Sequence, residues 1–210
     1  ARAAILEGKM AVVLGIEISN LFDCFLTPRE GFETCTAKSV GEKIDHYRDL
    51  GVRVIFPVHK FDNAFTSGDG SDGIIELGNF INSGHWSNFV EDCPDISAAF
   101  DGGGVTFGGI NQPRDEYESP AANDMSKFGT NPLGTLLPFL EQIQAPALEG
   151  EYCQKQGMTT LGETLMQELM KRGMMIDIAH LPKRSLERAY ELLEANQYPA
   201  VKTHGNTNGG

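Results

Sequence analysis

Two segments of the chain have the pattern of a buried β-strand that ends in histidine. Residues 173–180 read Gly-Met-Met-Ile-Asp-Ile-Ala-His, and residues 198–204 read Tyr-Pro-Ala-Val-Lys-Thr-His. The segment between them, residues 181–196, has helical character. Alternation of strand, helix and strand predicts parallel strands, whose carboxyl ends meet at one edge of a sheet. We therefore expect His180 and His204 to lie on the same rim, close enough to share a metal ion.

Two earlier segments repeat this arrangement of an apolar strand followed by a polar side chain. Residues 9–18 form a near-continuous apolar run that ends at Glu17, and they predict a buried strand. Residues 52–58 predict a second strand, which leads directly into His59. The chain thus carries a carboxylate and three imidazoles at the ends of successive predicted strands.

Helix signals separate these strands. A helix is predicted to begin at Ser39, whose hydroxyl can cap it, and to stop at Gly51. Another is predicted to begin at Thr159 or Thr160 and to stop at Gly173. The fold class that follows is α/β, with a parallel sheet.

A long Gly-, Asn- and Asp-rich region interrupts the alternation. Structureless loops of this length are rare in compact domains unless they are functional or folded as an insertion. We therefore describe residues 1–210 as a single domain with an insertion at about residues 66–156, and we predict helices within it at residues 74–89 and 136–143.

Composition narrows the classes of function. The 210 residues carry a formal net charge of −12, which repels phosphate backbones and argues against nucleic-acid binding. No apolar run approaches the roughly 20 residues needed to span a bilayer, so we expect no transmembrane segment. Small molecules and cations remain as partners. The chain begins with neither an initiating methionine nor a signal peptide. We expect both ends to have been cut from a longer chain, and a processed native terminus is the alternative.

The chain has four cysteines, at positions 24, 35, 93 and 153. Their spacing matches no zinc motif, and we predict the disulfides Cys24–Cys35 and Cys93–Cys153. An even number of cysteines in loop-like sequence favours an oxidising compartment, such as the periplasm or the extracellular space. Four ordinary thiols in a cytosolic protein are the alternative.

A carboxylate with imidazoles is a donor set that suits zinc and similar divalent ions. Two such ions about 3.5–4 Å apart activate a bridging water and polarise a carbonyl. In this arrangement Glu17 bridges the two ions, and His180 and His204 hold one of them. His59 donates a hydrogen bond to the substrate or to the developing oxyanion.

Three further polar residues lie near these positions. Asp177, three residues before His180, either orients an imidazole or is a buried structural carboxylate. Asp62 and Asn63 follow His59, and they either line the pocket or form a turn.

Several of these segments resemble the membrane (renal) dipeptidases, a family of the metal-dependent amidohydrolase superfamily. The similar segments are residues 161–180, 15–17, 51–59 with Asn63, and 200–205. The resemblance implies a dinuclear zinc site in a (β/α)8 TIM barrel, with the order Glu, His, His, His found here. It also implies a partial barrel of about four βα units.

Some of that family's residues have no counterpart in this chain. The family takes an H-x-D or H-x-H pair from its first strand, and this sequence contains no such motif. Its last-strand aspartate and its arginine for the substrate carboxylate would lie beyond His204. We therefore expect the fragment alone to have little activity.

The resemblance implies that the parent protein hydrolyses amide or peptide bonds in small, dipeptide-like substrates. Hydrolysis of a lactone or phosphoester is an alternative within the superfamily, because a fold alone does not determine the chemistry. A non-catalytic binding or structural domain on a decayed barrel is the alternative outside it. The open sheet edges of a partial barrel favour a homodimer.

Overall fold

The computed structural model describes residues 1–27, 29–69, 78–79, 82, 89–90, 92–96, 101 and 152–204. Its main sheet is parallel and contains β1 (Leu14–Ile16), β2 (Val52–Ile55) and β5 (Met175–Ile176), in that order. A parallel bridge between Asp177 and Val201 extends the sheet beyond β5. The predicted α/β class with a parallel sheet is therefore confirmed, and within this sheet the strands lie side by side in the order in which they occur in the chain.

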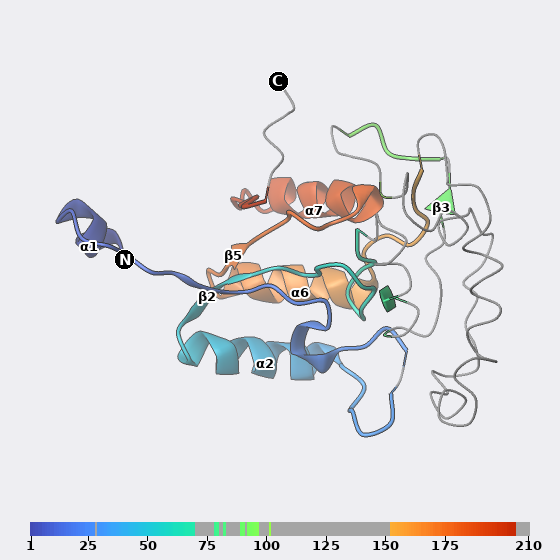
Figure 1. The fold of residues 1–210 in the computed structure, drawn as a ribbon, viewed down its shortest axis with the longest axis horizontal. Helices are drawn as coiled ribbons and strands as arrows, with labels where there is room; N and C mark the ends of the chain where they lie inside the picture. The colour runs from blue at the N-terminus through green and yellow to red at the C-terminus, as the bar shows by residue number, and fades with distance from the viewer. Residues whose placement is uncertain are drawn as a thin grey trace.

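Three helices connect these strands: α2 (Ala37–Asp49), α6 (Thr160–Lys171) and α7 (Lys183–Ala195). They lie side by side, with α6 packed between α2 and α7 (Figure 1). When each crossover is right-handed and each new strand joins the same edge of the sheet, successive helices lie on one face of that sheet. A doubly wound sheet instead reverses its strand order and has helices on both faces. The described strands contain no such reversal.

The predicted stops of two helices are confirmed. Gly51 follows α2 with φ +100°, and Gly173 follows α6 with φ +65°, a left-handed conformation that glycine adopts without strain. At the other end of α6, the Thr159 hydroxyl accepts a hydrogen bond from the Gly162 backbone N–H at 3.0 Å. Thr159, one of the two predicted caps, is therefore the N-cap.

The predicted N-cap of α2, Ser39, is wrong by three residues. Thr36 is the N-cap, and Ser39 lies in the first turn. The Ser39 hydroxyl accepts from the Thr36 N–H at 2.9 Å, and the Thr36 hydroxyl accepts from the Ser39 N–H at 3.2 Å. This reciprocal pair satisfies two backbone donors, whereas a cap at Ser39 would leave the Thr36 side chain without this role.

The prediction of a buried strand over residues 9–18 is also wrong. Within this range only β1 is a strand, and the residues before it are exposed to solvent. The relative exposure of Met10 is 88% and that of Val12 is 69%. A parallel strand is buried when neighbours cover both of its edges and faces. In the described part of the chain β1 pairs with β2 alone, and the preceding α1 (Arg2–Leu6) projects away from the body (Figure 1).

The core lies between the sheet and the three helices. Its apolar side chains are fully buried and come from every layer, including Leu21, Ile44, Ile55, Phe65, Leu165, Leu169 and Ile176. Phe65 belongs to the loop after β2, so this loop is anchored in the core. The Phe65 carbonyl accepts from the Thr159 N–H at 2.9 Å, and the Thr159 hydroxyl donates to the Ala64 carbonyl at 2.6 Å, so the loop is fixed to the start of α6.

The described parts of the predicted insertion contact the rest of the chain through hydrogen bonds, among them those from the Lys183 N–H to the two carboxylate oxygens of Asp101, both at 3.1 Å. Both predicted disulfides, Cys24–Cys35 and Cys93–Cys153, are present. An antiparallel pair joins β3 (Phe89–Val90) to β4 (Cys153–Gln154). The predicted helix at 136–143 lies outside the described residues, as does most of the one at 74–89. No helix in the described ranges has the length and apolar character needed to cross a membrane.

A substitution at Gly162 tests the docking of the loop after β2 on α6. A Cβ at this position would collide with the Phe65 carbonyl oxygen and would lie 2.7 Å from Met158 Cγ. We expect Gly162→Ala to lower the free energy of unfolding by roughly 1–3 kcal/mol in urea denaturation, although alanine favours helices.

Gly157→Ala is the matched control, because the nearest atom to its added Cβ, Arg184 Cβ, would lie at an ordinary 3.5 Å. A Gly162→Ala variant as stable as this control would contradict the proposed close packing of Phe65 on α6.

Candidate metal site

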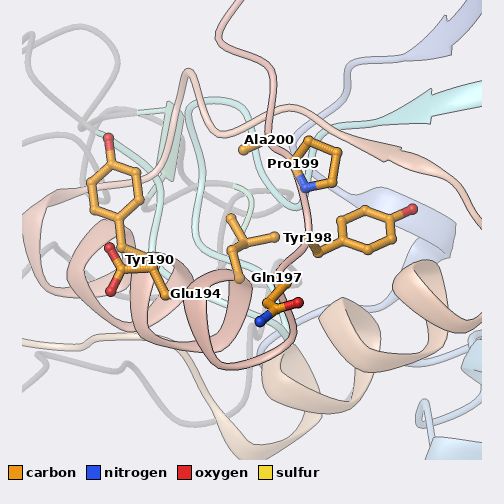
Figure 2. Close-up of a pocket in the computed structure, with 7 residues that line it drawn as sticks. Tyr190, Glu194, Gln197, Tyr198, Pro199 and Ala200 are labelled. Carbon is orange, nitrogen blue, oxygen red and sulfur yellow. The ribbon is translucent and has the colours of Figure 1, made fainter.

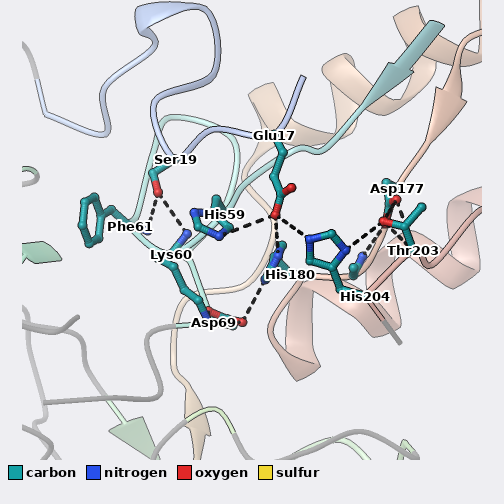
Figure 3. Close-up of polar contacts among 11 residues, drawn as sticks. Glu17, Ser19, His59, Lys60, Phe61, Asp69, Asp177, His180, Thr203 and His204 are labelled. Atoms are coloured by element: carbon teal, nitrogen blue, oxygen red, sulfur yellow. Dashed lines mark hydrogen bonds and ion pairs between the residues drawn. The ribbon is translucent and has the colours of Figure 1, made fainter. Parts of the chain in front are cut away.

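The four residues predicted to form the site converge at one edge of the sheet. Glu17 directly follows β1, and His59 follows β2 after a short loop. His180 and His204 follow the two segments joined by the Asp177–Val201 bridge. Figure 3 shows the three imidazoles pointing toward the Glu17 carboxylate from their separate strand ends. The parallel sheet therefore brings together residues that are up to 187 positions apart in the sequence (Glu17 to His204).

One oxygen atom is the centre of this cluster. Glu17 Oε1 lies 2.9 Å from His180 Nε2, 3.0 Å from His204 Nε2 and 3.5 Å from His59 Nε2. The His180 and His204 rings pack edge to face, with centroids 5.1 Å apart, as do those of His59 and His180 at 4.5 Å. The His180 side chain is only 10% exposed, whereas that of His204 is 48% exposed.

These distances fit a site for a divalent ion. The possible ligand atoms of Glu17, His59 and His180 all lie within 4.8 Å of one another, and His204 adjoins this group through Glu17. Donor atoms roughly 2.0–2.2 Å from a tetrahedral zinc ion are separated from one another by roughly 3.3–3.6 Å. The separations of Glu17 Oε1 from the imidazole nitrogens are close to this spacing, and the nitrogen and oxygen donors are those that zinc prefers.

The second ring nitrogen of His180 has its own partner. His180 Nδ1 lies 3.1 Å from Asp69 Oδ2. A carboxylate only accepts hydrogen bonds, so Nδ1 carries the proton in this contact. His180 Nε2 is the ring nitrogen that meets Glu17, 2.9 Å from Oε1. Without an ion this contact requires a proton on Nε2 as well, and a metal ion bound at Nε2 would take the place of that proton.

The Nδ1 atom of His204 also has a partner, the hydroxyl of Thr203. The Thr203 hydroxyl donates to Asp177 Oδ2 at 2.6 Å and lies 3.1 Å from His204 Nδ1. Because its one hydrogen is directed to the carboxylate, the hydroxyl accepts from Nδ1–H. Nε2 is then the His204 nitrogen that lies beside the Glu17 carboxylate, 3.0 Å from Oε1. Asp177 thus contacts an imidazole through Thr203 rather than directly.

The histidines differ in electrostatic environment. The hydrogen bond to Asp69 raises the pKa of His180 above its ordinary value, and it outweighs the opposing effect of burial. Burial lowers the pKa of His59, and the neighbouring His180 lowers it further. His59 is therefore a neutral imidazole at neutral pH, able both to donate and to accept a proton.

Asp62 and Asn63 are buried and lie in the loop after β2. The Asn63 amide donates to the carbonyls of Ser19 and Pro57 at 2.7 and 3.0 Å, so this side chain joins the ends of two strand segments. Asp62 Oδ1 accepts from the Gly68 N–H at 2.8 Å. Both contacts are those of residues that shape a turn, which was one of the two predicted roles.

Sequence reasoning missed Asp69 and its partner Lys60. The Lys60 ammonium contacts both carboxylate oxygens of Asp69, at 2.9 and 3.0 Å. Lys60 directly follows His59 at the end of a predicted strand, so its position could have marked it as a candidate site residue. Asp69 has no comparable signal, because it lies in a Gly- and Asp-rich run typical of loops and was included in the predicted insertion.

An open hollow of about 470 Å³ lies elsewhere (Figure 2). Its walls are the end of α7 and the chain entering the last strand segment, namely Tyr190, Leu193, Glu194, Gln197, Tyr198, Pro199 and Ala200. These residues precede Val201, so the hollow is at the amino end of that segment, whereas His204 is at its carboxyl end. Ligand sites of parallel α/β folds occur at the carboxyl ends.

A pH series tests the burial of Asp62. Burial raises its pKa from 3.8 to about 6, so its protonated form stabilises the fold below pH 3.8 and this contribution is lost as the pH rises through about 6. Asp62→Asn lacks this titration and keeps the acceptor for Gly68. We expect its free energy of unfolding to rise relative to the unsubstituted protein over this range, by on the order of 3 kcal/mol.

Exposed Asp49 is the control position, where Asp49→Asn should show no such trend. The same pH dependence in both variants would contradict the assignment to Asp62.

Comparison with known proteins bears on this site. Residues 139–209 match the family model described as membrane dipeptidase, peptidase family M19. Comparison with curated proteins finds no match, and comparison with solved structures finds none. The matched segment contains α6, β5 and α7, with both His180 and His204. Over this segment the predicted resemblance is confirmed, and the chain is similar to the membrane dipeptidases, a family of metal-dependent hydrolases.

Proposed function

We propose that the protein to which this chain belongs hydrolyses an amide or peptide bond in small, dipeptide-like substrates, with divalent ions held by Glu17, His180 and His204. Zinc is the ion that this donor set favours. The observation that carries the proposal is the orientation of His180 and His204. Each has Nδ1 directed to an acceptor and Nε2 directed to the Glu17 carboxylate.

The bound ion would supply a Lewis acid that polarises the substrate carbonyl and activates water for attack. The residues of the chain would hold the ion and orient its ligands. Glu17 provides the shared carboxylate at the centre of the cluster, where it can bridge two ions. Asp69 and Thr203 hold the protons on the far side of their histidine rings.

His59 has a separate role in this proposal. Its side chain is 38% exposed, so it can reach a substrate, and its lowered pKa keeps the ring neutral at neutral pH. A neutral imidazole that carries a proton can donate a hydrogen bond to the carbonyl oxygen as negative charge develops there. His59 Nε2 is also 3.5 Å from Glu17 Oε1, so a role as a further ligand is the alternative for this residue.

We further propose that the sheet is a sector of a (β/α)8 barrel. The support is the topology of the main sheet: β1, β2 and β5 lie side by side in chain order, and α2, α6 and α7 follow them in turn. In such a barrel the site lies at the carboxyl ends of the strands, as the Glu17 cluster does here. Other strands of the parent barrel would supply the remaining ligands.

Zinc content and hydrolysis test the proposal together. We expect His180→Ala to lower bound zinc, measured by elemental analysis, and to reduce hydrolysis of a dipeptide panel by the full-length protein at least 100-fold. His46→Ala is the matched control, because His46 is an exposed histidine on α2, outside the cluster.

Unchanged zinc and activity in His180→Ala would refute the assignment. Zinc binding without hydrolysis of any dipeptide, lactone or phosphoester would instead support a non-catalytic binding domain.

Removal of the ion tests whether the site contributes to stability. A ligand that binds only the folded state stabilises it by about 2.7 kcal/mol when its free concentration is 100 times its Kd. We therefore expect a chelator to lower the thermal unfolding midpoint of the zinc-loaded protein and to have little effect on His180→Ala. An equal shift in both proteins would show that the stabilising ion binds elsewhere.

A further inference from the structure

We propose that Asp69 is a positioning residue that holds His180 in its metal-binding tautomer, with Lys60 holding Asp69 in place. The inference rests on the proposed function, since it requires His180 to bind an ion through Nε2. It assigns a role to an aspartate that lies 111 positions from its histidine in the sequence.

The geometry separates Asp69 from the ligands themselves. Asp69 Oδ2 contacts His180 Nδ1 at 3.1 Å, whereas Glu17 Oε1 contacts His180 Nε2 at 2.9 Å. The two nitrogens of an imidazole are directed to different sides of the ring. A carboxylate at Nδ1 therefore acts on the ring, by holding its proton and increasing the basicity of Nε2, rather than on an ion bound at Nε2.

The chain is built to bring Asp69 to this position. Gly68, the preceding residue, lies so close to Lys60 that an added Cβ would collide with the Lys60 carbonyl oxygen. The Gly68 N–H donates to the buried Asp62 carboxylate at 2.8 Å. The segment that carries Asp69 is thus pressed against the segment that follows His59, as Figure 3 shows for Lys60 and Asp69.

Lys60 completes the arrangement. Its ammonium lies 2.9 and 3.0 Å from the two oxygens of Asp69, and both side chains are about three-quarters covered, with exposures of 26% and 25%. The lysine limits the rotation of the Asp69 carboxylate and partly neutralises it, so that a charged group can remain beside the nearly buried His180. Hydrogen-bonded partners of metal-binding histidines have this orienting function in general.

The test is zinc affinity measured by competition with a chromophoric chelator, using the full chain. We expect Asp69→Asn to weaken zinc binding about 10- to 100-fold, which is the usual effect of removing such a partner. Glu163→Gln is the matched control, because Glu163 is also a partly covered, ion-paired carboxylate, and its partner is Arg188 rather than a histidine. Its zinc affinity should be unchanged.

A double substitution and a spectroscopic signature distinguish positioning from a general loss of structure. In a His180→Ala background, Asp69→Asn should cause no further loss of zinc affinity, because the ring that it positions is absent. In the zinc-loaded protein, ¹⁵N NMR of the histidine rings should show His180 protonated at Nδ1, with Asp69→Asn reducing that population. Near-UV circular dichroism checks that each variant is folded.

The outcomes separate the two proposals. A large effect of His180→Ala with no effect of Asp69→Asn would overturn the role of Asp69 and leave the proposed function standing. An NMR spectrum with His180 bound to zinc through Nδ1 would overturn it as well. Unchanged zinc affinity in His180→Ala would overturn the ligand set and, with it, this inference.

Discussion

Parallel hydrogen bonding between strand ends is the constraint on which the candidate site depends. The Phe56 N–H donates to the Ile16 carbonyl at 3.0 Å, directly before Glu17, and the Asp177 N–H donates to the Ile55 carbonyl at 2.9 Å. The Ile178 N–H, two residues before His180, donates to the Val201 carbonyl at 2.9 Å. A shift of one residue in any of these pairs would turn a side chain to the other face of the sheet. The convergence on Glu17 is therefore a property of the register.

Asp177 connects this register to the chemistry of the site. Its backbone pairs with β2 and bridges to Val201, and its carboxylate accepts from the Ala179 N–H and from the Thr203 hydroxyl. A buried carboxylate is costly unless hydrogen bonds compensate it, and these donors lie on the two segments that carry His180 and His204. The same side chain thus joins the two segments at the end of the sheet and contacts His204 through Thr203, a geometry that is compatible with both of the roles predicted for it.

The sequence predicted the residues whose signals are local. Glu17, His180 and His204 each follow an apolar strand pattern, and parallel topology is sufficient to bring such positions together. The burial of residues 9–18 could not be predicted, because it depends on what covers β1 rather than on its composition. Asp69 was missed for a related reason: its role depends on a contact across 111 positions, and its own surroundings in the sequence are those of a loop.

The opposite electrostatic environments of His59 and His180 agree with the different roles proposed for them. Asp69 accepts a hydrogen bond from His180 Nδ1 and raises the pKa of His180, whereas burial and the proximity of His180 lower the pKa of His59. Environments that move the pKa values of neighbouring groups apart are characteristic of sites in which those groups do different work. A strongly held ring with one nitrogen directed to Glu17 suits a ligand. A neutral, more exposed ring at the same rim suits a group that meets the substrate.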